Sequence, residues 1–471
     1  MSNSVVCTSG ISPAESVERA AYAKVTWRLV PLLFISYVVA FLDRVNVGFA
    51  KLQMLSDLNF SESTYGLGAG IFFLGYVLFE VPSNIIQHQV GARRWISRIM
   101  ITWGVLSACM MFFRTPTMFY VMRFLLGIAE AGFLPGIVIY LTYWYPAHRR
   151  GKIMALFFAA VPASGLIGGP VSGWILESLS GVHGFAGWQW LFVLEALPSI
   201  VLGMVILLYL PDGIQGAPWL LQEEKNLLRE NIKADTHDKH EMRLRKVFSD
   251  RRVLVMAGIY LCATTGGYGI SFWLPSIVKG TGVVSSLSIG LLTAIPFLSA
   301  IFSTLFFSRS SDASRERKMH LVGTMSIGVA GLILSAYSGS STTAAIVTLS
   351  IASIGVFSAF PIFWSLPTAF LTGLSAAAAI AFITSVGNIG DFISSYLIGW
   401  IRQMSGSTSL AMLALAAVYF VGVLLTLTVP ARLVSSTSDC LSNIRYSNLL
   451  PPTDTRESFC APGLRVLFIS C

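Results

Sequence analysis

The chain has 471 residues, of which 54% are hydrophobic and only 12% are charged, and its mean hydropathy is +0.71. Soluble proteins carry about 25% charged residues, so this composition excludes an ordinary soluble domain and indicates a membrane protein. A net charge of +9 also suits nucleic acid binding, but the basic residues separate apolar segments and form no single patch. We therefore expect a lipid bilayer, and no nucleic acid, as the partner of this surface.

The start of the chain and the cysteines exclude some further classes. The first 27 residues contain Glu15 and Glu18 and no apolar core, so we expect no cleavable signal peptide. The six cysteines include no CxxC pair, and Cys109 and Cys262 lie within apolar segments. Neither a disulfide framework nor a zinc site is predicted, and we expect no metal and no cofactor.

Twelve apolar segments of about 20 residues follow one another, each long enough to cross a bilayer as one helix. The approximate ranges are 29–50, 65–86, 96–113, 117–140, 153–176, 189–210, 253–275, 287–307, 320–338, 343–365, 374–400 and 410–429. The sequence therefore predicts an all-α integral membrane protein with twelve transmembrane helices.

The longest polar stretch, 211–252, contains a charged helical core and divides the spans six and six. We predict a cytoplasmic N-terminal arm (1–28), two six-helix bundles (29–210 and 253–430), a cytoplasmic linker (211–252) and a disordered tail (431–471). The basic pairs Arg93–Arg94 and Arg317–Lys318 lie 224 positions apart in corresponding loops. They indicate either a repeat of two halves or only the basic character of short cytoplasmic loops.

The distribution of Lys and Arg predicts the orientation. With the N-terminus in the cytoplasm, 26 of these residues lie on the cytoplasmic side and only 4 on the opposite side. Cytoplasmic loops carry an excess of positive charge, so we expect both termini in the cytoplasm.

Seven ionisable residues lie within the predicted spans, where an isolated charge is costly and a functional role is the default interpretation. They are Asp43, Arg44, Glu80, Arg123, Glu130, Glu195 and Asp391. For each, the alternative is a structural ion pair or a side chain that reaches the interface.

Asp43, Arg44 and Glu130 are the strongest functional candidates. Asp43 and Arg44 lie about fifteen residues into the first span, and neighbours on a helix point about 100° apart, so they need not pair with each other. Glu130 is flanked by small residues that permit close helix packing. A buried carboxyl near an arginine is suited to take up and release a proton, which makes Glu130 a candidate for coupling.

The other polar residues in the spans divide into two groups. For Glu80, Arg123, Glu195 and Asp391 a structural or gating role is expected, with a ligand role as the alternative for Arg123. Asn388 and Asp391 share one helix face that could line a cavity from the second half. Trp364 could stack on an organic substrate, although packing is the commoner role of such an aromatic.

No catalytic constellation is visible. The sequence contains no HExxH, no GxSxG and no phosphate-loop lysine, so neither an enzyme nor an ATP-driven pump is supported.

With these residues in place, the chain resembles the anion:cation symporter family of the major facilitator superfamily. The matching segments cover the chain from about residue 25 to 430. They are FLDRVNVGFA (41–50), GYVLFEVPSN (75–84), GARRW (91–95), RFLLGIAEAGFLPG (123–136), YLTYWYPAHRRG (140–151), GWQWLFVLEALPS (187–199), SDASRERK (311–318) and FWSLPTAFLTG (363–373). The resemblance implies two pseudo-symmetric six-helix bundles, alternating access and proton-coupled uptake of small organic anions.

The resemblance also implies residue roles. Arg44 would bind the substrate carboxylate, Asp43 and Glu130 would be proton sites, and Tyr76, Trp364 and Asn388 would line the cavity. In the loops, Arg93, Arg94, Asp312 and Arg317 would have structural or gating roles. The chain departs from the family at Gly387-Asn-Ile-Gly-Asp391, where it adds a carboxylate.

The leading hypothesis is a monomeric transporter in the bacterial inner membrane that takes up a small carboxylate together with protons. Bacterial members of the family carry tartrate, hydroxyphenylacetate, phthalate and sugar acids. One alternative is an exporter of amphipathic drugs, which would have apolar cavity walls and little need of Arg44. The other is a nutrient sensor without net flux, for which a large additional cytoplasmic domain would be expected, and the sequence shows none.

Overall fold

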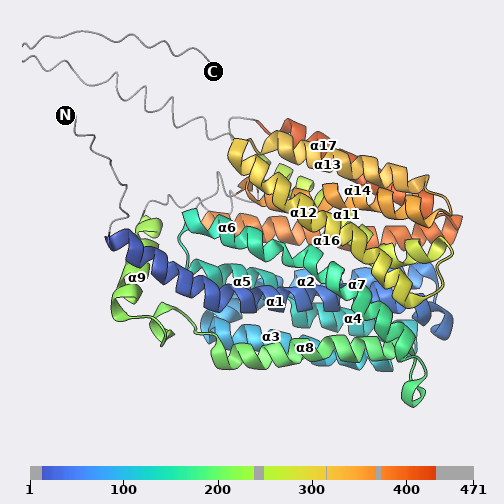
Figure 1. Cartoon of the computed structure of the whole chain (residues 1–471), viewed down its shortest axis with the longest axis horizontal. Coiled ribbons are helices and arrows are strands. Elements are labelled where there is room, and N and C mark those ends of the chain that lie inside the picture. Colours follow the sequence, from blue (N-terminus) through green and yellow to red (C-terminus); the bar gives the residue numbers. More distant parts are fainter. Residues whose placement is uncertain (1–12, 238–248, 315, 368–372, 431–471) are drawn as a thin grey trace, which may run out of the picture. The chain divides into compact units, whose positions relative to one another are not determined.

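The structure is a computed structural model that describes residues 13–237, 249–314, 316–367 and 373–430. The predicted disordered tail lies outside these residues. The described residues are helical almost throughout, and none of them forms a β-strand. Figure 1 shows most of the helices running side by side along one common direction, with α9 lying across one end.

Three short 3₁₀ turns and fifteen α-helices make up the described chain. The helices are α1 (Pro13–Leu58), α2 (Glu62–Val90), α3 (Ala92–Cys109), α4 (Pro116–Glu130), α5 (Phe133–Thr142), α6 (Ala147–Phe158), α7 (Ala160–Ser178), α8 (Gly187–Tyr209), α9 (Gln222–His237), α11 (Arg251–Gly280), α12 (Ser286–Ser314), α13 (Lys318–Ala336), α14 (Thr342–Trp364), α16 (Gly373–Ser405) and α17 (Thr408–Thr428). The 3₁₀ turns are Met110–Phe112, Val182–Gly184 and Ile214–Gly216.

Eleven helical stretches of the described chain are long and apolar enough to cross a membrane. They coincide with eleven of the twelve predicted spans. The remaining predicted span, 374–400, lies within α16, whose 33 residues exceed the length needed to cross a bilayer. The prediction of an all-α membrane protein is confirmed.

Two spans differ in detail from the prediction. The fourth crosses as expected, but its helix is interrupted between α4 and α5, because Gly132 adopts a left-handed backbone with φ of +88°. A Cβ at Gly132 would lie 2.3 Å from Ser83 Oγ, so the break also allows close approach of α2. The helix of the first span begins at Pro13, so the described part of the predicted N-terminal arm is helical.

The bundle has two ends, which we name by their contents. The linker end holds α9, at the left in Figure 1, and the far end is opposite. Four of the helices that begin at the far end are preceded by Ser or Thr caps, whose side-chain oxygens accept a backbone N–H of the first turn. These caps are Ser61, Thr115, Ser341 and Ser407.

Glycines bring the first six spans into contact with the last six. The helix α2 packs along α16, and α7 packs along α12. A Cβ at Gly169 of α7 would lie 2.6 Å from the carbonyl oxygen of Gly290, and one at Gly66 of α2 would lie 2.7 Å from that of Ser395. Small residues therefore let the backbones touch.

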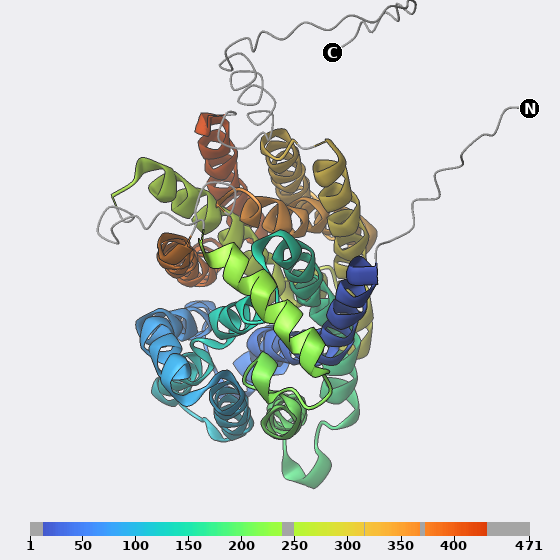
Figure 2. The ribbon, with the colours of Figure 1, turned by 90° about the vertical axis from the view of Figure 1, so that its left-hand side faces the viewer.

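The predicted helix of the central linker is α9, which crosses the linker end in front of the bundle in Figure 2. It is tied to α1 by Lys24, whose Nζ donates to Glu224 Oε1 at 2.5 Å. Burial by itself raises the pKa of Glu224, but the hydrogen bonds from Lys24 and from the Leu221 amide outweigh it, so the pKa lies below its usual value.

Candidate functional site

A central cavity of about 790 Å³ lies between the first six spans and the last six. Its polar lining residues come from both groups. The first group contributes Tyr37, Arg44, Tyr76 and Glu80, and the second contributes Tyr260, Thr264, Tyr268, Thr304, Thr384, Asn388 and Asp391. Tyr37 precedes Arg44 along α1, and Glu80 lies in the second half of α2, so the cavity extends from Arg44 toward the linker end.

Arg44 is the one Lys or Arg among the described residues that line this cavity. Its Nε donates to Glu130 Oε1 at 3.0 Å, and a second guanidinium nitrogen bonds the same oxygen. Its Nη1 donates to the Tyr268 hydroxyl at 2.6 Å, so the guanidinium also reaches the second half of the chain. The ring of Tyr76 lies 5.2 Å below the guanidinium carbon, close enough for a cation–π contact.

The position of Glu130 strengthens this ion pair. Glu130 is the last residue of α4, so Arg44 lies beside a helix C-terminus, where unpaired carbonyls favour a positive charge. Both side chains are buried, with 7% and 2% of their side-chain surface exposed. A buried cation and anion in such contact stabilise each other strongly, and each is costly without the other.

Asp43 points away from the cavity. Its carboxylate accepts hydrogen bonds from Trp103 Nε1 at 3.0 Å, Ser107 Oγ at 3.3 Å and Ser199 Oγ. These partners lie on α3 and α8, inside the first group of helices. Adjacent residues on a helix face directions about 100° apart, which explains why Arg44 lines the cavity and Asp43 does not.

Glu80 lines the cavity and links the two halves of the chain. Its carboxylate accepts from Thr384 Oγ1 at 3.2 Å and is 3.4 Å from Ser385 Oγ, both on α16. This contact joins α2 to α16 between Arg44 and the linker end.

Arg123 and Glu195 are buried outside the cavity lining. Arg123 donates to the backbone oxygens of Gly68 and Ala69 at 3.3 and 3.2 Å, and so joins α4 to α2. Glu195 accepts from Ser172 Oγ at 2.6 Å and joins α8 to α7. Both contacts lie within the first six spans.

Of the remaining predicted cavity residues, Tyr76, Asn388 and Asp391 line the cavity, whereas Trp364 lies behind its wall. The Trp364 ring stacks on Phe158 at 6.4 Å and meets Tyr260 edge-on at 5.0 Å. Because both of those rings line the cavity, Trp364 supports the wall from the second shell of side chains.

The predicted loop residues lie at the linker end. The backbone N–H of Arg93 donates to Asp212 Oδ1 at 2.9 Å, and Arg317 Nη1 donates to the carbonyl of Ser365 at 2.8 Å. The side chains of Arg94 and Asp312 are exposed. Two of the four thus bond to segments that connect helices, and two are exposed.

The sequence interpretation missed the tyrosines of α11. Tyr260, Thr264 and Tyr268 line the cavity at intervals of four residues, which places them on one helix face. Three polar side chains at that spacing in an apolar span could have been recognised from the sequence as a polar helix face. They were missed because they carry no charge.

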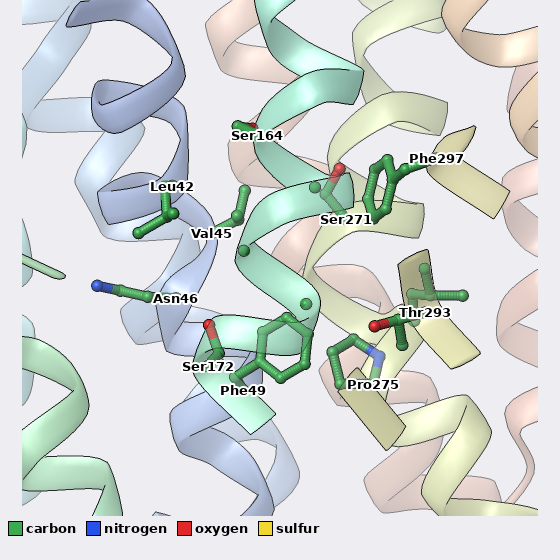
Figure 3. A pocket seen from close by; sticks show the side chains of 14 residues that line it. Leu42, Val45, Asn46, Phe49, Ser164, Ser172, Ser271, Pro275, Thr293 and Phe297 are labelled. Carbon is green, nitrogen blue, oxygen red and sulfur yellow. The ribbon is translucent and has the colours of Figure 1, made fainter. Parts of the chain in front are cut away.

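A smaller cavity of about 310 Å³ lies nearer the far end, between α1, α7, α11 and α12. Figure 3 shows its lining, which includes Val45, Ser271 and Phe297.

The far-end cluster closes the bundle beyond this cavity, and we define it as Lys51, Glu62, Trp273, Lys279 and Arg402. The ammonium of Lys51 lies 2.6 Å from Glu62 and 3.6 Å from the centre of the Trp273 ring. Arg402 is 3.7 Å from Glu62, and Lys279 Nζ donates to the carbonyl of Leu52 at 2.6 Å. The cluster therefore joins α1 and α2 to α11 and α16.

Comparison with known proteins gives three relatives of nearly full length. The chain is 45% identical to the metabolite transport protein named NicT of Pseudomonas putida, over 88% of this chain and 96% of that protein. It is 43% identical to a protein of Agrobacterium vitis named as a tartrate transporter, over 87% and 91%. It is 40% identical to a quinolone resistance transporter of Acinetobacter baumannii, over 88% and 96%.

The fold is that of solved transporters. A bacterial homologue of the human lysosomal transporter Spinster, in an inward-facing and occupied conformation, superposes with a TM-score of 0.69 at 15% identity, covering 86% of this chain and 96% of that one. The family model of the Major Facilitator Superfamily matches residues 33–395. The chain is thus a transporter and not an enzyme, and it belongs to the major facilitator superfamily.

Proposed function

We propose that this transporter takes up a small organic anion together with protons across the bacterial inner membrane. The observation that carries the proposal is the buried guanidinium of Arg44, which lines the central cavity and is held by Glu130. A guanidinium binds a carboxylate through two hydrogen bonds, so a carboxylate is the substrate group best suited to this position. The relative named as a tartrate transporter is consistent with such a substrate.

Coupling follows from competition for Arg44. Breaking a buried ion pair by removing one partner costs about 3–5 kcal/mol, because the remaining charge is uncompensated. Protonation of Glu130 removes its negative charge and frees the guanidinium, and a substrate carboxylate restores the neutral pair. Proton and anion therefore favour each other's binding, as linkage requires of a symporter.

Asp43 has a supporting role in this mechanism. It is the second predicted proton site, but its three hydrogen-bond donors hold α1 against α3 and α8 and it makes no contact with Arg44. We assign direct coupling to Glu130, and to Asp43 the positioning of the helix that carries Arg44.

The proposed orientation places the linker end in the cytoplasm, because the Lys- and Arg-rich loops lie there. The protein would act as a monomer of two bundles that move relative to each other around the Arg44 site. With the far-end cluster closed and the cavity extending toward the linker end, this conformation corresponds to one accessible from the cytoplasm.

The rival functions make different demands on Arg44. An exporter of amphipathic molecules needs apolar cavity walls and no fixed cation. A sensor binds its ligand but does not need to release it on the other side of the membrane. The ion pair at the centre of the cavity favours carboxylate transport over both.

The test is uptake of radiolabelled carboxylates into right-side-out vesicles, with and without an inward proton gradient. We expect gradient-stimulated uptake in the wild type, its loss in Arg44→Ala, and carboxylate binding without gradient stimulation in Glu130→Gln. Arg229→Ala is the matched control, because this arginine is exposed on α9, outside the cavity. Gradient-stimulated uptake that survives Arg44→Ala, or no uptake of any acid, would refute the proposal.

A further inference from the structure

Asp391 supplies a carboxyl group to the cavity wall that the proposed transport cycle does not use. Asp391 lies on α16, is 1% exposed and lines the same cavity as Arg44. Its Oδ1 accepts no hydrogen bond from the described residues. A buried carboxyl oxygen without a hydrogen-bond donor costs free energy. In a cavity wall, a bound ligand can supply the missing donor.

The other acidic groups near the cavity already have partners. Glu130 is paired with Arg44, and Glu80 accepts hydroxyl groups from α16. The hydroxyl of Thr264, the neighbour of Asp391, donates to the backbone oxygen of Gly387 at 3.0 Å. Of these three carboxyl groups, Asp391 is therefore the one with an oxygen, Oδ1, that receives no hydrogen bond from the described residues.

The cavity also separates its charges between the two halves of the chain. Arg44 is on α1, and Asp391 is on α16, with the Tyr268 ring of α11 beside Arg44. A molecule that holds Arg44 by a carboxylate and also fills the cavity brings its other end toward the wall that contains Asp391. If that end is apolar, Asp391 stays buried without a partner.

We propose that Asp391 is a specificity residue that selects carboxylates carrying a hydrogen-bond donor, a hydroxyl or ammonium group, at the end remote from the carboxylate. The inference rests on the proposed function, since the carboxylate is placed by Arg44. A site built to bond a donor rejects the analogue that lacks it, because the acceptor is then left unsatisfied. A hydrogen bond to a charged group contributes about 1.5–3 kcal/mol, which corresponds to roughly 10- to 100-fold in affinity.

The test compares matched ligands on purified protein by direct binding in detergent. Benzoate is the plain acid, hydroxybenzoates with the hydroxyl at each ring position supply an O–H donor, and 4-(aminomethyl)benzoate supplies an ammonium group. For the wild type we expect at least one donor-bearing acid to bind 10-fold or more tightly than benzoate. In Asp391→Leu this preference should fall to within about 3-fold, while benzoate binds as well as before or better.

Glu230→Leu is the control, because it removes an exposed acid of α9, outside the cavity. Asp391→Asn, which keeps the shape and an acceptor oxygen, should keep part of the preference for hydroxyl donors and lose that for ammonium. Unfolding temperatures establish that each variant is folded.

The outcomes separate the two proposals. A preference that persists unchanged in Asp391→Leu, or Arg44-dependent binding of all the acids without any preference in the wild type, overturns the role of Asp391 alone. Loss of proton coupling in Asp391→Leu with unchanged selectivity also overturns it, since Asp391 would then be a proton site. If no carboxylate binds the wild type, the proposed function and this inference fail together.

Discussion

Neutralising Glu62 should open the far end of the transporter. The far-end cluster holds Lys51 with only 3% of its side chain exposed, between Glu62 at 2.6 Å and the Trp273 ring. Glu62→Gln keeps the size of the side chain and removes its charge, so that Lys51 loses its only ion-pair partner among the described residues. Arg402 loses the same partner.

The size of the effect follows from these contacts. Removing one partner of a buried ion pair costs about 3–5 kcal/mol. Glu62 is 29% exposed, and the contact of Lys51 with Trp273 remains, so we expect a smaller loss, of about 2–3 kcal/mol. A far-end-open conformation lets water reach Lys51 and avoids this cost. Since 1.4 kcal/mol is a factor of ten, the equilibrium should move roughly a hundredfold toward that conformation.

A cysteine in place of Ser271 reports on the opening. Ser271 lines the smaller cavity behind the cluster and is 4% exposed, so a membrane-impermeant thiol reagent reaches it only when the far end opens. In a background with the six native cysteines replaced, Glu62→Gln should raise the labelling rate by up to a hundredfold. Asp57→Asn is the control, since this acid accepts from Trp188 and joins α1 to α8 within the first half of the chain.

An unchanged labelling rate in a folded Glu62→Gln variant would refute the reasoning, because the cluster would then not hold the far end closed. An equal increase of the labelling rate in Asp57→Asn would also refute the reasoning, because loss of any negative charge at the far end would then be enough to open it.

Two further predictions concern stability and pH. Gly127→Ala should lower the free energy of unfolding in detergent by about 1–3 kcal/mol, because the added Cβ would lie 2.0 Å from the backbone oxygen of Phe72. Gly323→Ala is the control and should change the free energy of unfolding little, because the space around Gly323 is open. Equal effects of the two changes would contradict the packing argument. Because Lys24 lowers the pKa of Glu224, this ion pair stabilises the folded state at pH values above the ordinary glutamate pKa. The stabilisation is lost as the pH falls through the lowered pKa. Amide exchange in α9 should therefore become faster than intrinsic rates predict as pH falls below about 4.5, and less so in Glu224→Gln.

The sequence was sufficient to predict the spans and the residue at the centre of the cavity. Long apolar runs have one stable arrangement in a bilayer, a helix, so their positions follow from composition. Arg44 was identifiable because an arginine at that depth must be paired or face water. Its partner Glu130 was chosen on the same ground, although the contact between the two was not predicted.

The directions of side chains and the uncharged lining could not be predicted as well. Asp43 and Arg44 are adjacent, and nothing in the sequence says which of them faces the second half. The break at Gly132 depends on the close approach of Ser83 across two helices, which a single helix pattern does not reveal. Tyr268 became visible only when α11 was placed beside Arg44.

The division of the cavity wall has a consequence for engineering. The guanidinium–carboxylate pair lies wholly on α1 and α4, while the described polar groups of α11 and α16 that line the cavity are two phenols, two threonine hydroxyls, an amide and one carboxyl. Apart from Tyr268, which accepts a hydrogen bond from Arg44, substitutions at the lining positions of α11 and α16 can therefore change the shape and hydrogen bonding of the site while both partners of the pair are kept. Exchange of these two helices with those of a relative is therefore a direct way to change the lining of the cavity while Arg44 and Glu130 are kept.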